Sequence, residues 1–306
     1  MGWAFLFPGQ GSQAVGMGRD LCERFAAARA VFQQADEALG FSLSQRCFAG
    51  PEEELRQTGL TQPAIFAHSV AVWRVLEERG VEPSCAAGHS LGEYSALVAA
   101  GALDFAAGLE LVRRRGQLMQ EQRQGSMAAV LGLDDEVVVS LCARAGGAVV
   151  AANFNAPGQV VISGAAAAVE QAGELARQAG ARRVVPLPVG GAFHSPLMEP
   201  AARELALLLQ EVEFKAPRVP VITNVAAAPM TDPARLREQL MQQMTHPVRW
   251  TAIVQRLAEM GTERAAEVGP GNVLKGLARR SAPQVTVFGA GTVEEIDELI
   301  KAHRGE

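Results

Sequence analysis

Short apolar segments alternate with helical segments along the first third of the chain, and glycine-rich turns join them. The apolar run Trp3–Phe7 leads into the turn Pro8–Ser12, and the run Cys85–Ala87 leads into the turn Gly88–Gly92. Short apolar runs bounded by glycine and proline predict buried strands. The alternation of strand, turn and helix therefore predicts an α/β fold, a large hydrolase-like domain with a largely parallel sheet.

Residues 125–190 follow a different order. Four short apolar runs and two helical segments there give the pattern β-α-β-β-α-β, which is ferredoxin-like. A unit of this size with its own pattern can form a small domain. We therefore expect an α/β core made of residues 1–124 and 191–306, interrupted by a ferredoxin-like subdomain at 125–190.

Expected core helices span Gly18–Leu39, Thr61–Arg79 with Thr61 as N-cap, Glu93–Ala100 and Asp104–Arg123. After the inserted unit we expect a helix following Ser195 and a strand at Val219–Thr223. The remaining elements expected are helices at Arg235–Met244 and Val248–Met260, and a strand, turn and helix over Ala265–Arg280.

Composition excludes several classes of protein. Hydrophobic residues make up 48% of the 306 residues, so the chain is not intrinsically disordered. A net charge of -5 and 5% aromatic residues argue against nucleic acid as a partner. The four cysteines form no C-x-x-C pair, which argues against a zinc site or a disulfide framework. We therefore expect no metal. The chain also shows no signal peptide and no long apolar run, so we expect a cytoplasmic protein without membrane association.

The turn Gly88–Gly92 fits the pattern G-x-S-x-G, with Ser90 at its centre. Small residues on either side permit a sharp turn from strand to helix that exposes the serine hydroxyl. The following helix would supply its N-terminal dipole and the N–H of Leu91 to a developing oxyanion. We interpret Ser90 as a nucleophile; the alternative is a glycine-rich turn with an exposed serine.

A serine nucleophile needs a base, and histidine is the usual one. Of the five histidines, His194 lies in a loop between a strand and a helix, a typical catalytic position. From the residues alone, His194 is equally well a loop residue that caps the next helix. The other four, His68, His89, His246 and His303, lie in a helix, beside the serine, in a turn and near the C-terminus.

The α/β-hydrolase pattern is incomplete, because the chain has no H-G-G-G loop and no obvious acidic loop shortly before His194. The turn Gly9–Gly11 after the first strand is a second source of oxyanion N–H groups, or simply an ordinary β-α turn. Gly269–Asn272 lacks the lysine and serine of a phosphate-binding loop, so we interpret it as structural.

Taken in order, the motifs resemble those of malonyl-CoA:acyl-carrier-protein transacylases and the wider acyltransferase family of fatty-acid and polyketide synthases. They cover the chain nearly from end to end. The matching segments are Phe7–Gln13, Thr61–Ala64, Gly88–Leu97, Arg115–Gly116 with Met119, Asn153–Gln159, Phe193–Ser195, Pro247–Trp250 and Glu267–Gly271.

The resemblance implies a serine-histidine dyad of Ser90 and His194, without a carboxylate. A backbone carbonyl from Pro247–Trp250 would orient the histidine, and Arg249 stands where relatives can carry glutamine. The N–H groups of Gln10 and Leu91 would form the oxyanion hole.

The resemblance also places the family's carboxylate-binding arginine at Arg115. A guanidinium can grip the distal carboxylate of malonate with two hydrogen bonds, whereas an acetyl group offers nothing to pair with. Phe193 matches the malonyl-selective pattern of the family.

The resemblance implies transfer of a malonyl group from malonyl-CoA to the phosphopantetheine thiol of an acyl carrier protein. The protein would then be an [acyl-carrier-protein] S-malonyltransferase of fatty-acid biosynthesis, and it would need no cofactor. Two alternatives stay open. One is a polyketide-associated loading acyltransferase or acyl hydrolase of the same fold, and the other is an inactive scaffold that binds carrier proteins.

Carrier proteins are typically acidic, so an acidic chain needs a local basic face to bind one. We expect that face to be formed by residues after Gly271 and residues of the inserted unit: Lys275, Arg279, Arg280, Arg182 and Arg183.

Overall fold

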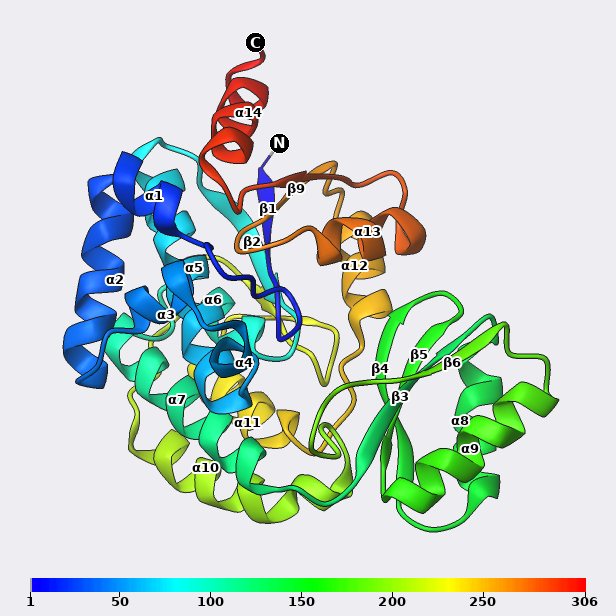
Figure 1. Cartoon of the computed structure of the whole chain (residues 1–306). Helices are drawn as coiled ribbons and strands as arrows, with labels where there is room; N and C mark the ends of the chain where they lie inside the picture. Colours follow the sequence, from blue (N-terminus) through cyan, green and yellow to red (C-terminus); the bar gives the residue numbers. More distant parts are fainter. Residues whose placement is uncertain (1) are drawn as a thin grey trace.

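A computed structural model describes residues 2–306 and shows a six-stranded sheet in the larger part of the molecule (Figure 1). Its strands are β1 (Trp3–Phe7), β2 (Pro83–Gly88), β7 (Val221–Ile222), β8 (Pro229–Met230), β9 (Arg264–Glu267) and β10 (Thr286–Gly289). They lie in the order β10-β9-β1-β2-β7-β8, and only the β7–β8 pair is antiparallel. The predicted α/β fold with a largely parallel sheet is confirmed.

Helices cover both faces of this sheet, as Figure 1 shows. Along β1, alternate side chains point to opposite faces. Trp3, Phe5 and Phe7 belong to one buried apolar cluster, while Ala4 and Leu6 belong to a second. The helices of the core are α1 (Arg19–Arg24), α2 (Ala26–Leu39), α3 (Leu43–Ala49), α4 (Glu52–Leu55), α5 (Thr58–Glu78), α6 (Gly92–Ala99), α7 (Phe105–Glu121), α10 (Glu199–Glu211), α11 (Pro233–Gln243), α12 (Trp250–Glu259), α13 (Val273–Ser281) and α14 (Val293–Arg304), with a 3-10 turn at Pro196–Met198.

The inserted segment forms a separate antiparallel sheet beside the core (Figure 1). Its elements are β3 (Ser126–Leu131), α8 (Asp135–Ala145), β4 (Val149–Ala156), β5 (Gln159–Gly164), α9 (Ala166–Gln178) and β6 (Arg183–Pro186). The strand order β4-β5-β3-β6 is that of a ferredoxin-like unit, as predicted. The boundaries at residues 125 and 190 stay a prediction.

Several predicted helix ends are wrong. Phe25 takes an extended conformation (φ -119°, ψ 126°) and buries its ring, so the helix predicted for Gly18–Leu39 is two helices. Thr61 is not an N-cap: α5 begins at Thr58, and the Thr61 hydroxyl donates to the Leu55 carbonyl at 2.6 Å. Five further elements were not predicted from the sequence: α3, α4, β8, β10 and α14.

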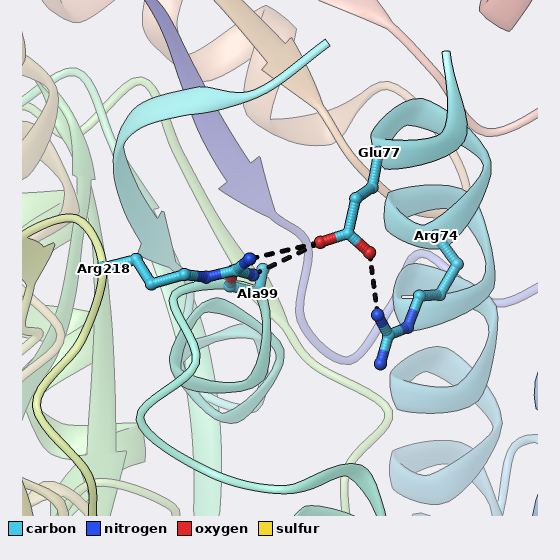
Figure 2. A network of polar contacts seen from close by, with 4 residues as sticks. All are labelled: Arg74, Glu77, Ala99 and Arg218. Atoms are coloured by element: carbon cyan, nitrogen blue, oxygen red, sulfur yellow. Dashed lines mark hydrogen bonds and ion pairs between the residues drawn. The ribbon is translucent and has the colours of Figure 1, made fainter. Parts of the chain in front are cut away.

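A polar network on the surface ties the segment that enters β7 to α5 and α6 (Figure 2). Arg218 Nη2 donates to the Ala99 carbonyl at 3.2 Å and to Glu77 Oε1 at 3.3 Å, and Arg74 donates to Glu77 at 2.7 Å. The Arg218 side chain is 61% exposed, so its ion pair contributes less than ~1 kcal/mol of stability. The network joins the segment just before β7 to the two helices, and Asn224 follows the end of β7 by two residues.

None of the helices in residues 2–306 is long and apolar enough to cross a membrane.

Candidate active site

Ser90 occupies a sharp turn between β2 and α6. Its backbone is left-handed (φ 51°), a conformation that costs a non-glycine residue roughly 1–2 kcal/mol. The flanking glycines make the turn possible. A Cβ on Gly88 would lie 1.9 Å from the Gly92 carbonyl carbon, and one on Gly92 would lie 2.0 Å from the Phe7 carbonyl oxygen. The nucleophile-elbow geometry predicted from G-x-S-x-G is present.

His194 lies beside this serine. Its Nε2 atom is 2.7 Å from Ser90 Oγ, although 104 residues separate the two in the chain. His194 also has a left-handed backbone (φ 57°) and is buried. Two strained residues whose side chains meet are typical of a functional site.

Two main-chain carbonyls accept from the other ring nitrogen of His194. Nδ1 lies 2.9 Å from the oxygen of Gln243 and 3.2 Å from that of His246. The carbonyls therefore come from the residues just before Pro247–Trp250, and the segment predicted for this role is wrong. The reason is that Val248 pairs with β4: its N–H donates to Ala152 and its carbonyl accepts from Phe154, both at 2.9 Å.

This arrangement fixes the tautomer of His194, since a carbonyl accepts only from a protonated Nδ1 and leaves Nε2 free to accept from Ser90. Burial, followed by the charge of Arg115, lowers the pKa of His194 to about 3. The imidazole is therefore neutral near pH 7 and able to take the serine proton.

Arg115 on α7 reaches the same point and is 1% exposed. Its Nη2 atom donates to Ser90 Oγ at 3.0 Å and to Gln243 Oε1 at 3.0 Å, while Nη1 donates to Gln62 Oε1 at 2.8 Å. Burial lowers the pKa of Arg115, yet a guanidinium stays charged at any physiological pH. Its Nε–H has no partner within residues 2–306, so the group keeps donor capacity for an anion.

The neighbouring arginines do not enter the site. Arg113 pairs with Glu110 and Arg114 with Glu204, both on the surface. Of the three consecutive arginines, only Arg115 turns inward.

Gln10 and Leu91 lie on either side of the serine. Neither backbone N–H donates to an acceptor within residues 2–306. Both residues line a cavity of about 170 Å³ together with Ser90, Arg115 and His194. The structure thus brings all five predicted site residues around one small cavity, and Phe193 lines it as well.

Three buried polar residues around Ser90 were not predicted from the sequence. The Asn224 side chain accepts from the Ser90 N–H at 2.7 Å and donates to the Gly88 carbonyl at 2.6 Å. These two bonds to the main chain stabilise the turn that holds Ser90. Glu93 Oε2 accepts from the Asn224 N–H at 3.2 Å and from Gln243 Nε2 at 2.8 Å. Burial raises the pKa of Glu93 to about 7, against the opposing effect of these bonds. The only sequence signal was that Glu93 follows the motif; Asn224 and Gln243 lie in no recognised pattern.

The other histidines take no part in this contact. His89 Nε2 lies 2.8 Å from Asn155 Oδ1, and His303 Nδ1 accepts from Trp3 at 3.0 Å. His68 is buried in α5, and the His246 ring lies at the surface beside Gln242.

No group of three His, Cys, Asp or Glu side chains in residues 2–306 is placed to hold a metal ion. The turn at Gly269–Asn272 offers no free anion site, because the Glu267 carboxylate already binds the N–H groups that follow it. Glu267 accepts from the N–H groups of Leu274 and Lys275 at 3.0 and 2.8 Å, where an anion would otherwise bind the start of α13.

Comparison with known proteins connects this geometry to a family. A model of the acyl transferase domain matches residues 4–300. The malonyl CoA-acyl carrier protein transacylase of Haemophilus influenzae is 47% identical over 285 residues, 91% of each chain. An acyl carrier protein S-malonyltransferase from Vibrio cholerae superposes with a TM-score of 0.95 at 48% identity, covering 98% of this chain and 100% of that one. A malonyl-transacylase solved in complex with a type II PKS acyl-carrier protein has a TM-score of 0.95 at 43% identity, with full coverage of both chains.

Proposed function

The chain belongs to the malonyl-CoA:acyl carrier protein transacylases of the acyl transferase family, and we propose that Ser90 carries the malonyl group from coenzyme A to the carrier protein. The enzyme is an [acyl-carrier-protein] S-malonyltransferase of fatty-acid biosynthesis. The observation that carries the residue assignment is the position of Ser90 Oγ, 2.7 Å from His194 Nε2 and 3.0 Å from Arg115 Nη2.

In the first half-reaction, His194 Nε2 takes the Ser90 proton as Oγ attacks the thioester carbonyl of malonyl-CoA. The N–H groups of Gln10 and Leu91 stabilise the tetrahedral oxyanion. Collapse of this intermediate breaks the C–S bond, and the departing sulfur receives the proton from the imidazolium. The products are malonyl-Ser90 and free coenzyme A.

The second half-reaction runs the same steps with another thiol. The phosphopantetheine thiol of the carrier protein gives its proton to His194 and attacks the malonyl-Ser90 ester. Collapse breaks the C–Oγ bond, and the imidazolium returns the proton to Ser90. These steps are carbonyl additions and proton transfers, so the mechanism needs no metal or redox cofactor.

Arg115 selects the substrate in this scheme. Its guanidinium lies in the cavity beside Ser90, where it meets the distal carboxylate of a malonyl group. An acetyl group leaves this buried cation unpaired, and the unmet donors penalise acetyl transfer.

The carrier protein meets a basic surface on α13 and at the start of β6 in this proposal. Lys275, Arg279, Arg182 and Arg183 are exposed, and their side chains have no ion-pair partner within residues 2–306. Arg280 differs from the prediction, because its guanidinium donates to Gln159 and to the Pro157 carbonyl at 2.6 and 2.7 Å. It links α13 to the β4–β5 hairpin, so we omit it from the docking surface.

Intact mass spectrometry tests the function directly. Malonyl-CoA without carrier protein is expected to leave one malonyl adduct, which disappears in Ser90→Ala and is discharged by added phosphopantetheinylated carrier protein. An adduct that persists in Ser90→Ala contradicts the nucleophile assignment. Release of free malonate in preference to transfer indicates an acyl hydrolase instead.

A further inference from the structure

Gln243, the last residue of α11, contacts three residues that the proposed reaction uses, Ser90, His194 and Arg115, and it is 1% exposed. Its main-chain carbonyl accepts from His194 Nδ1 at 2.9 Å. Its side-chain oxygen accepts from Arg115 Nη2 at 3.0 Å, and its side-chain nitrogen donates to the Ser90 carbonyl at 2.9 Å. The main-chain contact belongs to the dyad described above; the side-chain contacts are separate and need their own explanation.

The orientation of this side-chain amide is fixed by its partners. Nε2 donates both of its hydrogens, one to the Ser90 carbonyl and one to Glu93 Oε2 at 2.8 Å. Rotating the amide by half a turn would put the NH2 group against the Arg115 guanidinium and the oxygen against two acceptors. The carbonyl oxygen of the amide therefore faces Arg115.

A second amide holds the other side of the guanidinium. Gln62 Oε1 on α5 accepts from Nη1 at 2.8 Å, while Gln243 Oε1 accepts from Nη2. Two acceptors on different nitrogens determine the plane of the group. With Nη2 held 3.0 Å from Ser90 Oγ, the spacing between the cation and the nucleophile is set as well.

We propose that the side chain of Gln243 is a positioning residue that holds Arg115 at a fixed distance from Ser90 and thereby selects short acyl groups with a distal carboxylate. The proposal rests on the function given above. Without the Gln243 amide, the guanidinium keeps two contacts, with Gln62 and with Ser90 Oγ. Because Ser90 Oγ is itself the reacting atom, Gln62 is then the one acceptor that can hold the guanidinium throughout the reaction. The malonyl carboxylate and the thioester carbonyl would no longer be aligned at the same time.

The test compares Ser90 acylation by malonyl-CoA and by acetyl-CoA in Gln243→Met. Methionine preserves the length and most of the volume of the side chain but removes the amide, and the main-chain carbonyl to His194 remains. Any general damage to the dyad slows both acyl donors equally and cancels in the ratio of their kcat/KM values. We expect the malonyl-to-acetyl ratio to fall at least about tenfold, the effect of losing one hydrogen bond to a charged group.

Gln243→Glu is a second variant, for the case in which methionine does not fold. Its carboxylate would bind the guanidinium directly and compete with the malonyl carboxylate, so the malonyl-to-acetyl ratio of kcat/KM values is expected to fall at least about tenfold in this variant as well. Gln242→Ala is the matched control, because this neighbouring side chain is directed to Glu238 on the surface. An unchanged ratio in both variants, with the malonyl adduct intact in wild type, overturns the positioning role. Absence of the wild-type adduct overturns the proposed function instead.

Discussion

His194 Nδ1 lies 2.9 Å from the main-chain carbonyl oxygen of Gln243, at the C-terminal end of α11. The last carbonyls of a helix have no partner within it and carry its partial negative charge. The histidine is therefore oriented by the end of an 11-residue helix, where many serine enzymes use a carboxylate. A partial charge stabilises the imidazolium less than a full one does. Burial and the charge of Arg115 therefore outweigh the carbonyl contacts and keep the pKa of His194 low, which favours rapid return of the proton to the leaving group.

The turn around Ser90 predicts a large effect of a single added methyl group. Gly92→Ala would place Cβ 2.0 Å from the Phe7 carbonyl oxygen, a main-chain atom of a buried strand that cannot move away cheaply. We expect a loss of at least ~3 kcal/mol in the free energy of unfolding, together with loss of the malonyl adduct. Urea unfolding and intact mass measure the two effects.

Gly276→Ala is the matched control for that substitution. Gly276 lies within α13, and its added Cβ would meet nothing within 4 Å. Alanine there is expected to stabilise the enzyme by roughly 0.5–1 kcal/mol. Equal effects of the two substitutions would contradict the steric account of the turn.

The contrast between Ser90 and Gln243 shows what a sequence can predict here. The geometry of Ser90 is determined by its immediate neighbours, Gly88 and Gly92, so a five-residue pattern predicts it. Gln243 acts on Ser90 across 153 residues, and its role depends on where α11 ends. No local pattern encodes where α11 ends. For the same reason, the main-chain carbonyl that orients His194 was wrongly predicted to come from Pro247–Trp250.

The same limit applies to the fold. The buried strand Trp3–Phe7 and the β-α-β-β-α-β order were predictable, because periodicity and turn residues determine them locally. The break at Phe25 was not, since no glycine or proline marks it and its buried ring lies against Arg79, a residue far away in the sequence.

Replacing Arg115 separates substrate selection from chemistry. Arg115→Ala removes the cation that meets the malonyl carboxylate, so kcat/KM for malonyl transfer is expected to fall at least about 100-fold. Acetylation of Ser90 by acetyl-CoA is expected to change far less, because an acetyl group makes no bond to the guanidinium. Rates of adduct formation from both donors test this. Malonyl transfer at the wild-type rate would contradict the carboxylate-binding role.

Stability is expected to depend on pH through His68. Burial lowers its pKa from 6.5 to about 4 in the folded enzyme, so below pH 6.5 the unfolded state binds a proton that the folded state excludes. The contribution to stability is present above pH 6.5 and is lost as the pH falls toward 4. From pH 8 to pH 5 this one group accounts for about 2 kcal/mol of lost stability.

His68→Leu removes that group and is expected to reduce the loss of unfolding free energy between pH 8 and pH 5 by about 2 kcal/mol. Urea unfolding at the two pH values measures it. His194 has a lowered pKa too, so part of the loss is expected to persist in this variant. Identical losses in wild type and His68→Leu would mean that folding does not lower the pKa of His68.

Charge reversal on α13 separates the two half-reactions, because only the second one uses a carrier protein. Lys275 and Arg279 are exposed on this helix, and an acidic partner is attracted to them over several ångströms. We expect Lys275→Glu with Arg279→Glu to lower kcat/KM for carrier protein at least about tenfold at low salt, and much less at high salt, where such attraction is screened. The rate of Ser90 malonylation by malonyl-CoA is expected to stay unchanged, since both side chains lie outside the cavity lined by Ser90 and His194. Arg203→Glu on α10 is the control, a 77% exposed arginine on a different helix. Equal loss in both half-reactions, or an equal effect of the control, would contradict α13 as the docking surface.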